Sequence, residues 1–170
     1  ETAMHARDPH GILKEIFKLF LKKGGKFINE KISHLKQINE NETLIESGTG
    51  KHKFEKTVIA TGAFSKVLTD QLGENIPLDT ERGYHVHFKN MSHLLSRPVI
   101  FLDRGFGLTP MNQGLRAVGT VELGGLNNPP SKKRINYLVN CAKELLPQLK
   151  EHEDEWLGFR PTLPDFLPIL

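Results

Sequence analysis

The first regular pattern in the chain is helical, with apolar residues recurring at steps of three and four positions. It starts after Asp8, whose side chain suits a helix cap, and at Pro9, whose missing N–H would be unpaired in a first helical turn anyway. Lys22 and Lys23 suit the negative end of the helix dipole, and a pair of glycines follows. The pattern therefore predicts a helix with an apolar stripe of Ile12, Leu13, Ile16, Phe17, Leu19 and Phe20.

Residues 26–61 change to short segments of strand-like composition, separated by the turn-forming stretches NENE and GTGK. These segments predict a small antiparallel meander. The next stretch, TVIATG at residues 57–62, has a continuous apolar middle, which is typical of a strand buried on both faces. A short helix should follow, capped by Ser65 and ended by Gly73.

The second half of the chain is predicted to be mostly strand. In RGYHVHF, Tyr84, Val86 and Phe88 alternate with two histidines, so one face of this strand should be apolar and the other polar. PVIFLD, FGLTPM and LRAVGTVEL continue the pattern, with a tight turn at Asn112–Gln113–Gly114. A long helix should start after Ser131 and end before Pro147, with an irregular tail behind it. Its apolar stripe is Ile135, Leu138, Val139, Ala142, Leu145, Leu146 and Leu149.

These elements predict an α+β (or α/β) fold, in which a mixed, largely antiparallel sheet is flanked by helices and a smaller part contains the meander and the buried strand. We expect boundaries that separate residues 1–75, 76–157 and 158–170.

The composition is that of an ordinary folded domain: 38% of the 170 residues are hydrophobic and 25% are charged. The net charge of +3 is mild, and the scattered lysines lack interleaved aromatic residues, which speaks against a nucleic-acid binder. The single cysteine, Cys141, excludes an internal disulfide and a cysteine-rich zinc site; beside the helix stripe it predicts a small core residue. No apolar run is long enough to span a bilayer.

Two segments could carry chemistry. The ATG end of the predicted buried strand would let backbone approach a flat or phosphorylated ligand at Gly62, or it is only a tight exit before a helix. Arg160, between an aromatic residue and a proline, could bind a carboxylate with its fork of donors or form a salt bridge to an acid such as Asp165. The pair His85 and His87 has metal-ligand spacing but no acidic partner at a telling distance, so we expect no metal site.

Five segments, in this order along the chain, resemble the flavin-dependent D-amino-acid oxidase and dehydrogenase family, which includes glycine oxidase. DPHGILKEIFKLFLKKGGKF is similar to the family's D-P-x-x helix and following glycine, and KTVIATGAFS to its strand with A-x-G-x-x-S. IPLDTERGYHV resembles P-x-x-x-x-R/K-G-Y of the D-amino-acid dehydrogenase branch, and LTPMNQGLRAVGTVE resembles a hairpin ending in G-G/T. WLGFRPTLPDFLPIL resembles W-x-G-x-R-P-x-x-P-D-x-x-P-x-I-G.

The resemblance implies FAD as the cofactor. Residues 1–75 would belong to an FAD-binding domain, 76–157 to a substrate domain, and 158–170 to a segment that returns to the flavin. The family's G-x-G-x-x-G unit, which holds the cofactor's pyrophosphate, has no counterpart in this sequence. We therefore expect the chain to be an internal fragment. Its cofactor contacts would be Ile32, whose main chain would read the adenine, and Thr61 and Gly62 beside the cofactor.

For the substrate, the resemblance implies that Arg160 clamps the α-carboxylate and that Tyr84 lines the pocket. Gly107 stands where glycine oxidases carry an aromatic hydroxyl, which implies room for a sizeable side chain. Alternatively Gly107 serves a bulged strand, with Phe106 filling the gap. No residue is expected to act as a catalytic base.

The expected function is therefore that of a fragment of an FAD-dependent oxidoreductase, which oxidises the C–N bond of a D-amino acid or related amine to an imino acid. The alternative is a cofactor-free carboxylate-binding or regulatory module of the same fold, and a nucleic-acid binder is a distant third. We expect a cytoplasmic location or one at the inner face of the membrane, where the intact enzyme would meet a peripheral membrane or electron-acceptor partner. The fragment should self-associate through apolar residues near its end, which are Phe166, Leu167, Ile169 and Leu170.

Overall fold

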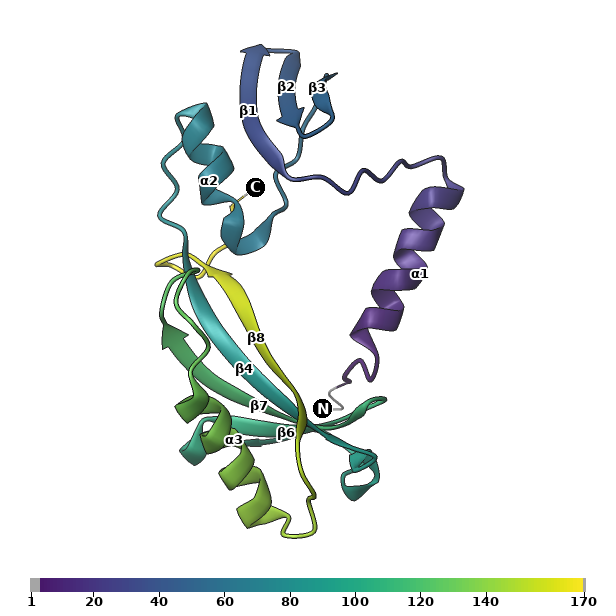
Figure 1. Ribbon diagram of the computed structural model, residues 1–170, viewed down its shortest axis with the longest axis vertical. Coiled ribbons are helices and arrows are strands. Elements are labelled where there is room, and N and C mark those ends of the chain that lie inside the picture. Colours follow the sequence, from purple (N-terminus) through teal and green to yellow (C-terminus); the bar gives the residue numbers. More distant parts are fainter. Residues whose placement is uncertain (1–3, 170) are drawn as a thin grey trace. The chain divides into compact units, whose positions relative to one another are not determined.

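The computed structural model describes residues 4–169, and the chain forms two compact units (Figure 1). The first unit contains the residues up to Gly24 together with Glu81–Gly158, and the second contains Gly25–Thr80 together with Phe159–Leu170. The first helix thus groups with the sheet of the second half of the chain. Helices and largely antiparallel strands occur as the α+β prediction requires, which confirms the fold class.

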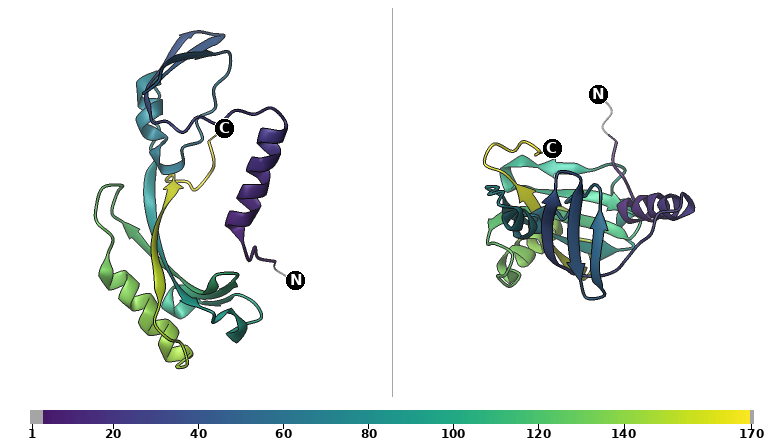
Figure 2. Two further views of the ribbon diagram at one scale, coloured as in Figure 1. Left: turned by 45° about the vertical axis from the view of Figure 1, so that its right-hand side comes forward. Right: turned by 90° about the horizontal axis from the view of Figure 1, so that it is seen from above.

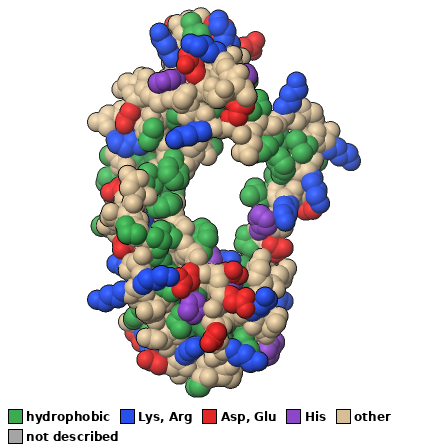
Figure 3. Space-filling view, in the orientation of Figure 1, with side chains coloured by type: hydrophobic (Ala, Val, Ile, Leu, Met, Phe, Trp, Pro, Cys, Tyr) green, Lys and Arg blue, Asp and Glu red, His purple; other side chains and the backbone are tan. Residues whose placement is uncertain are grey.

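The first helix, α1 (Pro9–Lys22), forms where the sequence predicts it. A carboxylate oxygen of Asp8 accepts a hydrogen bond from the Gly11 backbone N–H at 2.9 Å, and Gly24 follows the helix with a φ of 88°. No residue of α1 is buried, and Ile12 and Leu13 are 53% and 62% exposed. Figure 3 shows hydrophobic side chains at the surface of this helix, among lysines. The predicted apolar stripe therefore exists but lies on the surface and not in the core.

A five-stranded sheet, with strand order β5-β6-β7-β4-β8, forms the centre of the first unit (Figures 1 and 2). Strand β4 pairs antiparallel with β7, β7 with β6, and β6 with β5, as the alternating patterns and the turn at residues 112–113 predict. The strands are β4 (Asp79–Lys89), β5 (Val99–Phe101), β6 (Phe106–Met111), β7 (Gly114–Leu123) and β8 (Glu153–Thr162), and single turns of 3-10 helix follow β4 and β5 at Ser92–Leu94 and Leu102–Arg104.

The core of this unit lies between one face of the sheet and helix α3 (Lys132–Leu145). Tyr84, Val86 and Phe88 of β4 are fully buried there, which confirms the predicted apolar face. Cys141 is buried in the same cluster as a free thiol, as predicted. The remaining buried residues of the cluster are Phe106, Leu108, Leu115, Ala117, Ile135, Leu138, Val139, Ala142 and Leu149.

The second unit contains the predicted antiparallel meander of β1 (Ile32–Asn39), β2 (Glu42–Ser47) and β3 (Gly50–Phe54) (Figure 2). A short helical stretch follows, composed of 3-10 turns at Gly62–Phe64 and Asp70–Leu72 around α2 (Lys66–Thr69). Gly73 ends it in the left-handed conformation with a φ of 81°, as predicted. The predicted cap is wrong, because the Ser65 side chain bonds no helix N–H and its own backbone is already helical.

The buried strand predicted at residues 57–62 does not form, because Gly62 starts a 3-10 turn and residues 57–61 belong to no strand. This segment has no regular secondary structure and pairs with no strand in the described part of the chain, and Val58 is 86% exposed. A continuous apolar run becomes a buried strand only when neighbouring strands supply hydrogen bonds on both sides. The segment has the apolar composition of a buried strand, but residues 4–169 supply no neighbouring strand for it.

The end of the chain also differs from the predicted irregular tail, because β8 runs through Trp156 to Thr162 as an edge strand next to β4. Beyond it, the Phe166 N–H donates a hydrogen bond to the Leu163 carbonyl at 3.0 Å and closes a turn, and residues 164–169 are exposed. Leu170 lies outside the described residues. No helix within residues 4–169 is long and apolar enough to cross a membrane.

Candidate functional site

The second unit contains a cavity of about 930 Å³. Its walls come from two segments far apart in the sequence, the ATG region with the start of the short helix, and the tail that begins at Pro161. This volume is in the range of sites that hold a cofactor or a drug-sized ligand. The lining is mostly apolar and consists of Thr57–Ala60, Gly62, Ser65, Thr69, Ile76, Leu78, Pro161–Leu163 and Phe166–Ile169.

Gly62 lines this cavity in a left-handed conformation, with a φ of 57°, and a Cβ on it would meet nothing within 4 Å. Backbone at this position can therefore approach a ligand closely. Next to it, the hydroxyls of Thr61 and Ser65 lie 3.1 Å apart, within hydrogen-bond distance. The buried hydroxyl of Thr57, also in the lining, has no hydrogen-bond partner within residues 4–169. The cavity thus offers a few polar groups on an apolar wall.

Ile32, the third residue predicted to contact the cofactor, starts β1 and pairs with Ser47. It is not part of the cavity lining. The structure therefore brings Gly62, with Thr61 beside it, to the cavity and leaves Ile32 outside it. The predicted role of the Ile32 main chain stays a prediction.

Arg160 directly precedes the cavity-lining Pro161, and its side chain is exposed. Within residues 4–169 its guanidinium forms no ion pair, so the predicted alternative of a salt bridge to Asp165 is not realised. The Asp165 carboxylate instead accepts a hydrogen bond from the Leu167 N–H at 3.1 Å. On the other side of Arg160, the ring of Phe159 packs edge-on against Phe64 at 5.8 Å. Arg160 thus keeps its full set of donors for a carboxylate.

Gly107, in the first unit, lies in β6 between Ile100 of β5 and Val118 of β7, in regular register. The alternative of a bulged strand is therefore wrong at this position. Phe106 does not fill a gap beside Gly107, because it points into the core and stacks on Phe101 at 5.1 Å. A Cβ on Gly107 would come within 3.1 Å of the Val99 carbonyl oxygen.

The sheet face that carries Gly107 also carries two contacts that the sequence did not predict. The imidazole of His85 stacks on the indole of Trp156, with ring centroids 4.7 Å apart. Burial, with nearby Arg116 and His87, lowers the pKa of His85 to about 4, so this ring is neutral at pH 7. Beside it, Nε of Arg116 donates a hydrogen bond to Nε2 of His87 at 3.1 Å. Burial and Arg116 also lower the pKa of His87, although Asp154 acts in the opposite direction.

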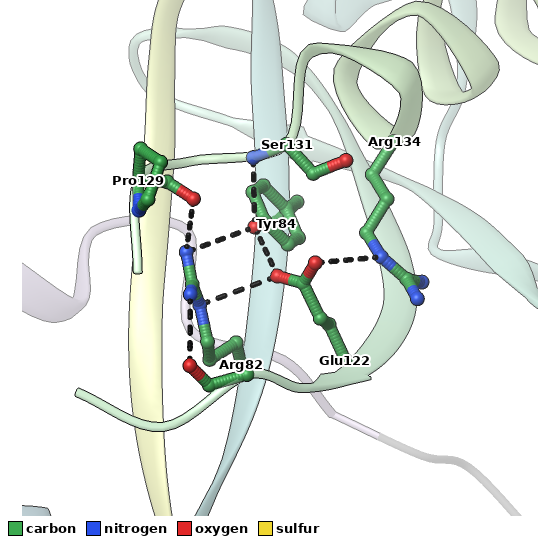
Figure 4. A network of polar contacts seen from close by, with 7 residues as sticks. Arg82, Tyr84, Glu122, Pro129, Ser131 and Arg134 are labelled. Atoms are coloured by element: carbon green, nitrogen blue, oxygen red, sulfur yellow. Dashed lines mark hydrogen bonds and ion pairs between the residues drawn. The ribbon is translucent and has the colours of Figure 1, made fainter. Parts of the chain in front are cut away.

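The resemblance assigns Tyr84 to the wall of the substrate pocket, whereas in the structure its hydroxyl lies in a network of polar contacts. Its hydroxyl donates to a Glu122 carboxylate oxygen at 2.5 Å and accepts hydrogen bonds from Arg82 and from the Ser131 backbone N–H (Figure 4). The Glu122 carboxylate also pairs with Arg82 at 3.3 Å and Arg134 at 3.6 Å. This network ties β4 and β7 to the start of α3. A direct contact of Tyr84 with substrate stays a prediction.

Arg82 anchors the same network from a fully buried position. It donates to the Pro129 carbonyl at 2.9 Å and to the Gly124 carbonyl at 3.4 Å, so the loop before α3 is held by its guanidinium (Figure 4). The helix starts after Ser131, as the sequence predicts, but the Ser131 hydroxyl makes no capping bond, and the bonds of Arg82 hold the preceding loop instead. Sequence reasoning missed Arg82 because nothing local distinguishes a buried arginine from a surface one.

Comparison with known proteins identifies relatives over the whole chain. A family described as FAD dependent oxidoreductase matches residues 1–170. The D-amino-acid oxidase of Bradyrhizobium diazoefficiens is 33% identical over all of this chain and 42% of that protein, and the D-amino acid dehydrogenase of Paramagnetospirillum magneticum is 28% identical over 96% of this chain and 40% of that protein. The chain therefore spans about two fifths of the length of these relatives.

Solved structures show the same fold. The L-proline dehydrogenase of P. horikoshii superposes with a TM-score of 0.78 at 20% identity, over 93% of this chain and 45% of that structure. The glycine oxidase of Geobacillus kaustophilus superposes with a TM-score of 0.71 at 22% identity, over 85% of this chain and 39% of that structure.

Proposed function

Because the chain belongs to the FAD-dependent oxidoreductase family, we propose that it is part of an enzyme that oxidises the C–N bond of a D-amino acid or a related amine to an imino acid. The choice of D-amino acids as substrates rests on the names of the relatives described above. It is a proposal because the chain covers only about two fifths of the length of these relatives.

The single observation that carries this proposal is the shared cavity of the second unit. Gly62 and Pro161 lie far apart in the sequence but line the same space, and Arg160 directly precedes Pro161. These are the segments that the resemblance assigns to the cofactor and to the substrate carboxylate. Their meeting is what a site that holds both would require.

The residues present fit part of an FAD molecule. The apolar lining suits a flat ring system, and the open left-handed backbone at Gly62 permits close approach. The Thr57 hydroxyl, which has no hydrogen-bond partner among the described residues, could bond a polar edge. The pyrophosphate needs a set of backbone N–H donors at a helix start, and this sequence has no G-x-G-x-x-G segment to supply them. The chain by itself should therefore bind FAD weakly.

When bound, FAD would supply the redox chemistry by accepting a hydride from the substrate α-carbon. The role of this chain is to position the substrate. Arg160 would hold the α-carboxylate through two parallel hydrogen bonds, which fixes the orientation of the α-C–H bond. As the hydride leaves the carbon and a proton leaves the nitrogen, a C=N bond forms, and water hydrolyses the product after release. None of these steps assigns a proton transfer to a residue of this chain.

Gly107 supports a preference for substrates with sizeable side chains. It lies buried in β6 in regular register and has no side chain, so it takes up none of the space that an aromatic side chain would need at this position. The same proposal includes a partner of the intact enzyme, which is a peripheral membrane protein or an electron acceptor. It also includes a location in the cytoplasm or at the inner face of the membrane.

A cofactor-free carboxylate-binding module remains the second candidate, favoured by the exposed Arg160 with no ion pair within residues 4–169. Two measurements separate the candidates. The protein expressed from its complete reading frame should retain FAD through gel filtration and should turn over D-alanine, D-phenylalanine or D-proline faster than glycine. A flavin-free protein that still binds simple carboxylates would support the module instead, and a clear preference for glycine would contradict the role of Gly107.

A further inference from the structure

We propose that Lys66 is a positioning residue for the cofactor, because its ammonium group ties two parts of the cavity lining to each other. The ligand in this inference, FAD, rests on the proposed function. The contacts that carry the inference lie entirely within the second unit.

The lining of the cavity includes a helical stretch and the segment of chain that follows it. Ser65 and Thr69, one helical turn apart, line the cavity from the start and the end of α2. Ile76 and Leu78 line it from the segment directly before β4. We call residues 75–78 the wall segment. The shape of the cavity therefore depends on how the wall segment is attached to α2.

The wall segment has few hydrogen bonds of its own. The chain reverses after the helical stretch, where the Glu74 N–H donates to the Thr69 carbonyl at 3.1 Å. Beyond this point Pro77 has no N–H to donate. The one backbone–backbone hydrogen bond of the wall segment within residues 4–169 runs from the Leu78 N–H to the Ile76 carbonyl at 2.8 Å. Backbone bonds therefore do not attach the wall segment to α2.

Lys66 makes this attachment with its side chain. Its Nζ donates to the Ile76 carbonyl at 2.8 Å and to the side-chain oxygen of Asn75 at 3.1 Å. The third contact of Nζ is the Asp70 carboxylate, at 3.8 Å. An ammonium group has three donors, and hydrogen bonds from a charged donor are stronger than neutral ones. Because Ser65 precedes Lys66 directly and lines the cavity, these bonds fix the wall segment relative to the cavity-lining helix.

Gln71 fastens the same helical stretch to a different partner. Its Oε1 accepts a hydrogen bond from the Leu35 N–H at 2.8 Å, and its Nε2 donates to the carbonyls of Val67 at 3.2 Å and Ser33 at 3.4 Å. Two of these bonds join the stretch to β1, and neither Gln71 nor its partners line the cavity. The two side chains thus have separate tasks, since Gln71 attaches the meander and Lys66 attaches the wall segment.

Loss of the Lys66 bonds should weaken cofactor binding through the wall segment. Without them this segment would occupy its binding-competent position in only part of the molecules, and the apparent Kd of a ligand rises by the inverse of that fraction. Lys66→Met removes the donors and keeps an unbranched side chain. We expect the Kd for FAD to rise about tenfold in this variant. Lys66→Arg should restore most of the affinity, because a guanidinium can also donate to two acceptors.

The test uses the product of the complete reading frame, freed of flavin and titrated with FAD while the flavin fluorescence is recorded. Urea unfolding gives the stability of each variant. Gln71→Leu is the matched control, since it also removes hydrogen bonds from the helical stretch but none of them reaches the cavity lining. Its Kd for FAD should stay close to that of the unsubstituted protein. A Kd that is unchanged in Lys66→Met, or raised equally in Gln71→Leu at an equal loss of stability, would overturn the proposal.

A second measurement, amide hydrogen exchange on the chain itself, needs no flavin. Lys66→Met should speed the exchange of the Leu78 N–H and leave the Leu35 N–H unchanged, and Gln71→Leu should do the reverse. If FAD binds but its Kd does not respond to Lys66→Met, the positioning inference fails and the proposed function stands. If no variant binds FAD, the proposed function fails, and the exchange of Leu78 still decides whether Lys66 holds the wall segment.

Discussion

The indole of Trp156 lies against the imidazole of His85, with centroids 4.7 Å apart and ring planes 16° apart. The stack joins the edge strand β8 to β4, and the Trp156 ring also covers Gly158, where a Cβ would overlap it. This packing explains why a glycine stands two residues after the tryptophan in the segment WLGFRP. The tryptophan folds back over the glycine two residues on, and the strand then leads to Arg160.

We predict that Gly158→Ala disrupts this stack. The new methyl group would occupy the position of the Trp156 ring, which must move away from His85. The expected cost in unfolding free energy is about 1–3 kcal/mol, as for other overpacked sites. Urea unfolding measures the cost, and a red shift of tryptophan emission reports the displaced ring. Gly48→Ala is the matched control, because a Cβ there meets nothing within 4 Å. An unchanged spectrum in Gly158→Ala would contradict the described packing.

Stability should fall as the pH drops from about 6.5 toward 4. The pKa of His85 is lowered from 6.5 to about 4 in the folded state, so the unfolded chain takes up a proton first. This contribution to stability is fully present above the unfolded pKa, and protonation of His87, whose pKa is also lowered, acts in the same direction. The measurement is the urea midpoint at about pH 7.5 and about pH 5.5. His85→Phe should reduce the difference, while the exposed His93→Gln should leave it unchanged.

The network around Tyr84 should contribute to stability through its hydroxyl. Tyr84→Phe removes one donor and one acceptor, and leaves the Ser131 N–H and the Glu122 carboxylate with fewer partners. We expect a loss of about 1–3 kcal/mol in unfolding free energy. Tyr137→Phe deletes an exposed hydroxyl that bonds one carbonyl and should cost less than about 0.5 kcal/mol. Equal losses in the two variants would refute a special role for the network.

Arg160→Ala should affect substrate binding and not stability. The side chain is exposed and unpaired within residues 4–169, so its removal leaves no buried partner behind. In the intact enzyme, losing a charge-assisted hydrogen bond to the substrate carboxylate would cost about 1.5–3 kcal/mol, seen as a raised KM. Arg160→Lys should restore only part of this loss, because an ammonium lacks the planar fork. An Ala variant with normal kinetics and a lower melting temperature would indicate a structural role.

Much of the fold could be predicted because local signals decide it. The cap at Asp8, the stop at Gly24 and the alternation around Tyr84 each act within one element, and the structure confirms them. The segment at residues 57–61 could not be predicted in the same way. Its strand state depends on partners elsewhere, and residues 4–169 supply none.

The candidate site was predictable only where a motif marks it. Gly62 and Arg160 stand in distinctive local sequences, whereas Arg116 looks like any polar residue of an alternating strand. Its position beside His87 follows from the register of β4 and β7, and that register includes an irregularity between Gly83 and Tyr84 that no local pattern reveals. Sequence alone cannot supply a contact that depends on such a shift.

The central claim, that this chain helps an FAD enzyme to oxidise D-amino acids, is tested most directly by anaerobic reduction of the bound flavin. The flavin-loaded product of the complete reading frame would be mixed with D-amino acids and with their L-enantiomers in the absence of oxygen. We predict that the absorbance of oxidised flavin is lost with D-amino acids and kept with the L-forms, and that Arg160→Ala needs much higher concentrations. A flavin that stays oxidised with every D-amino acid, with glycine and with D-proline would contradict the account.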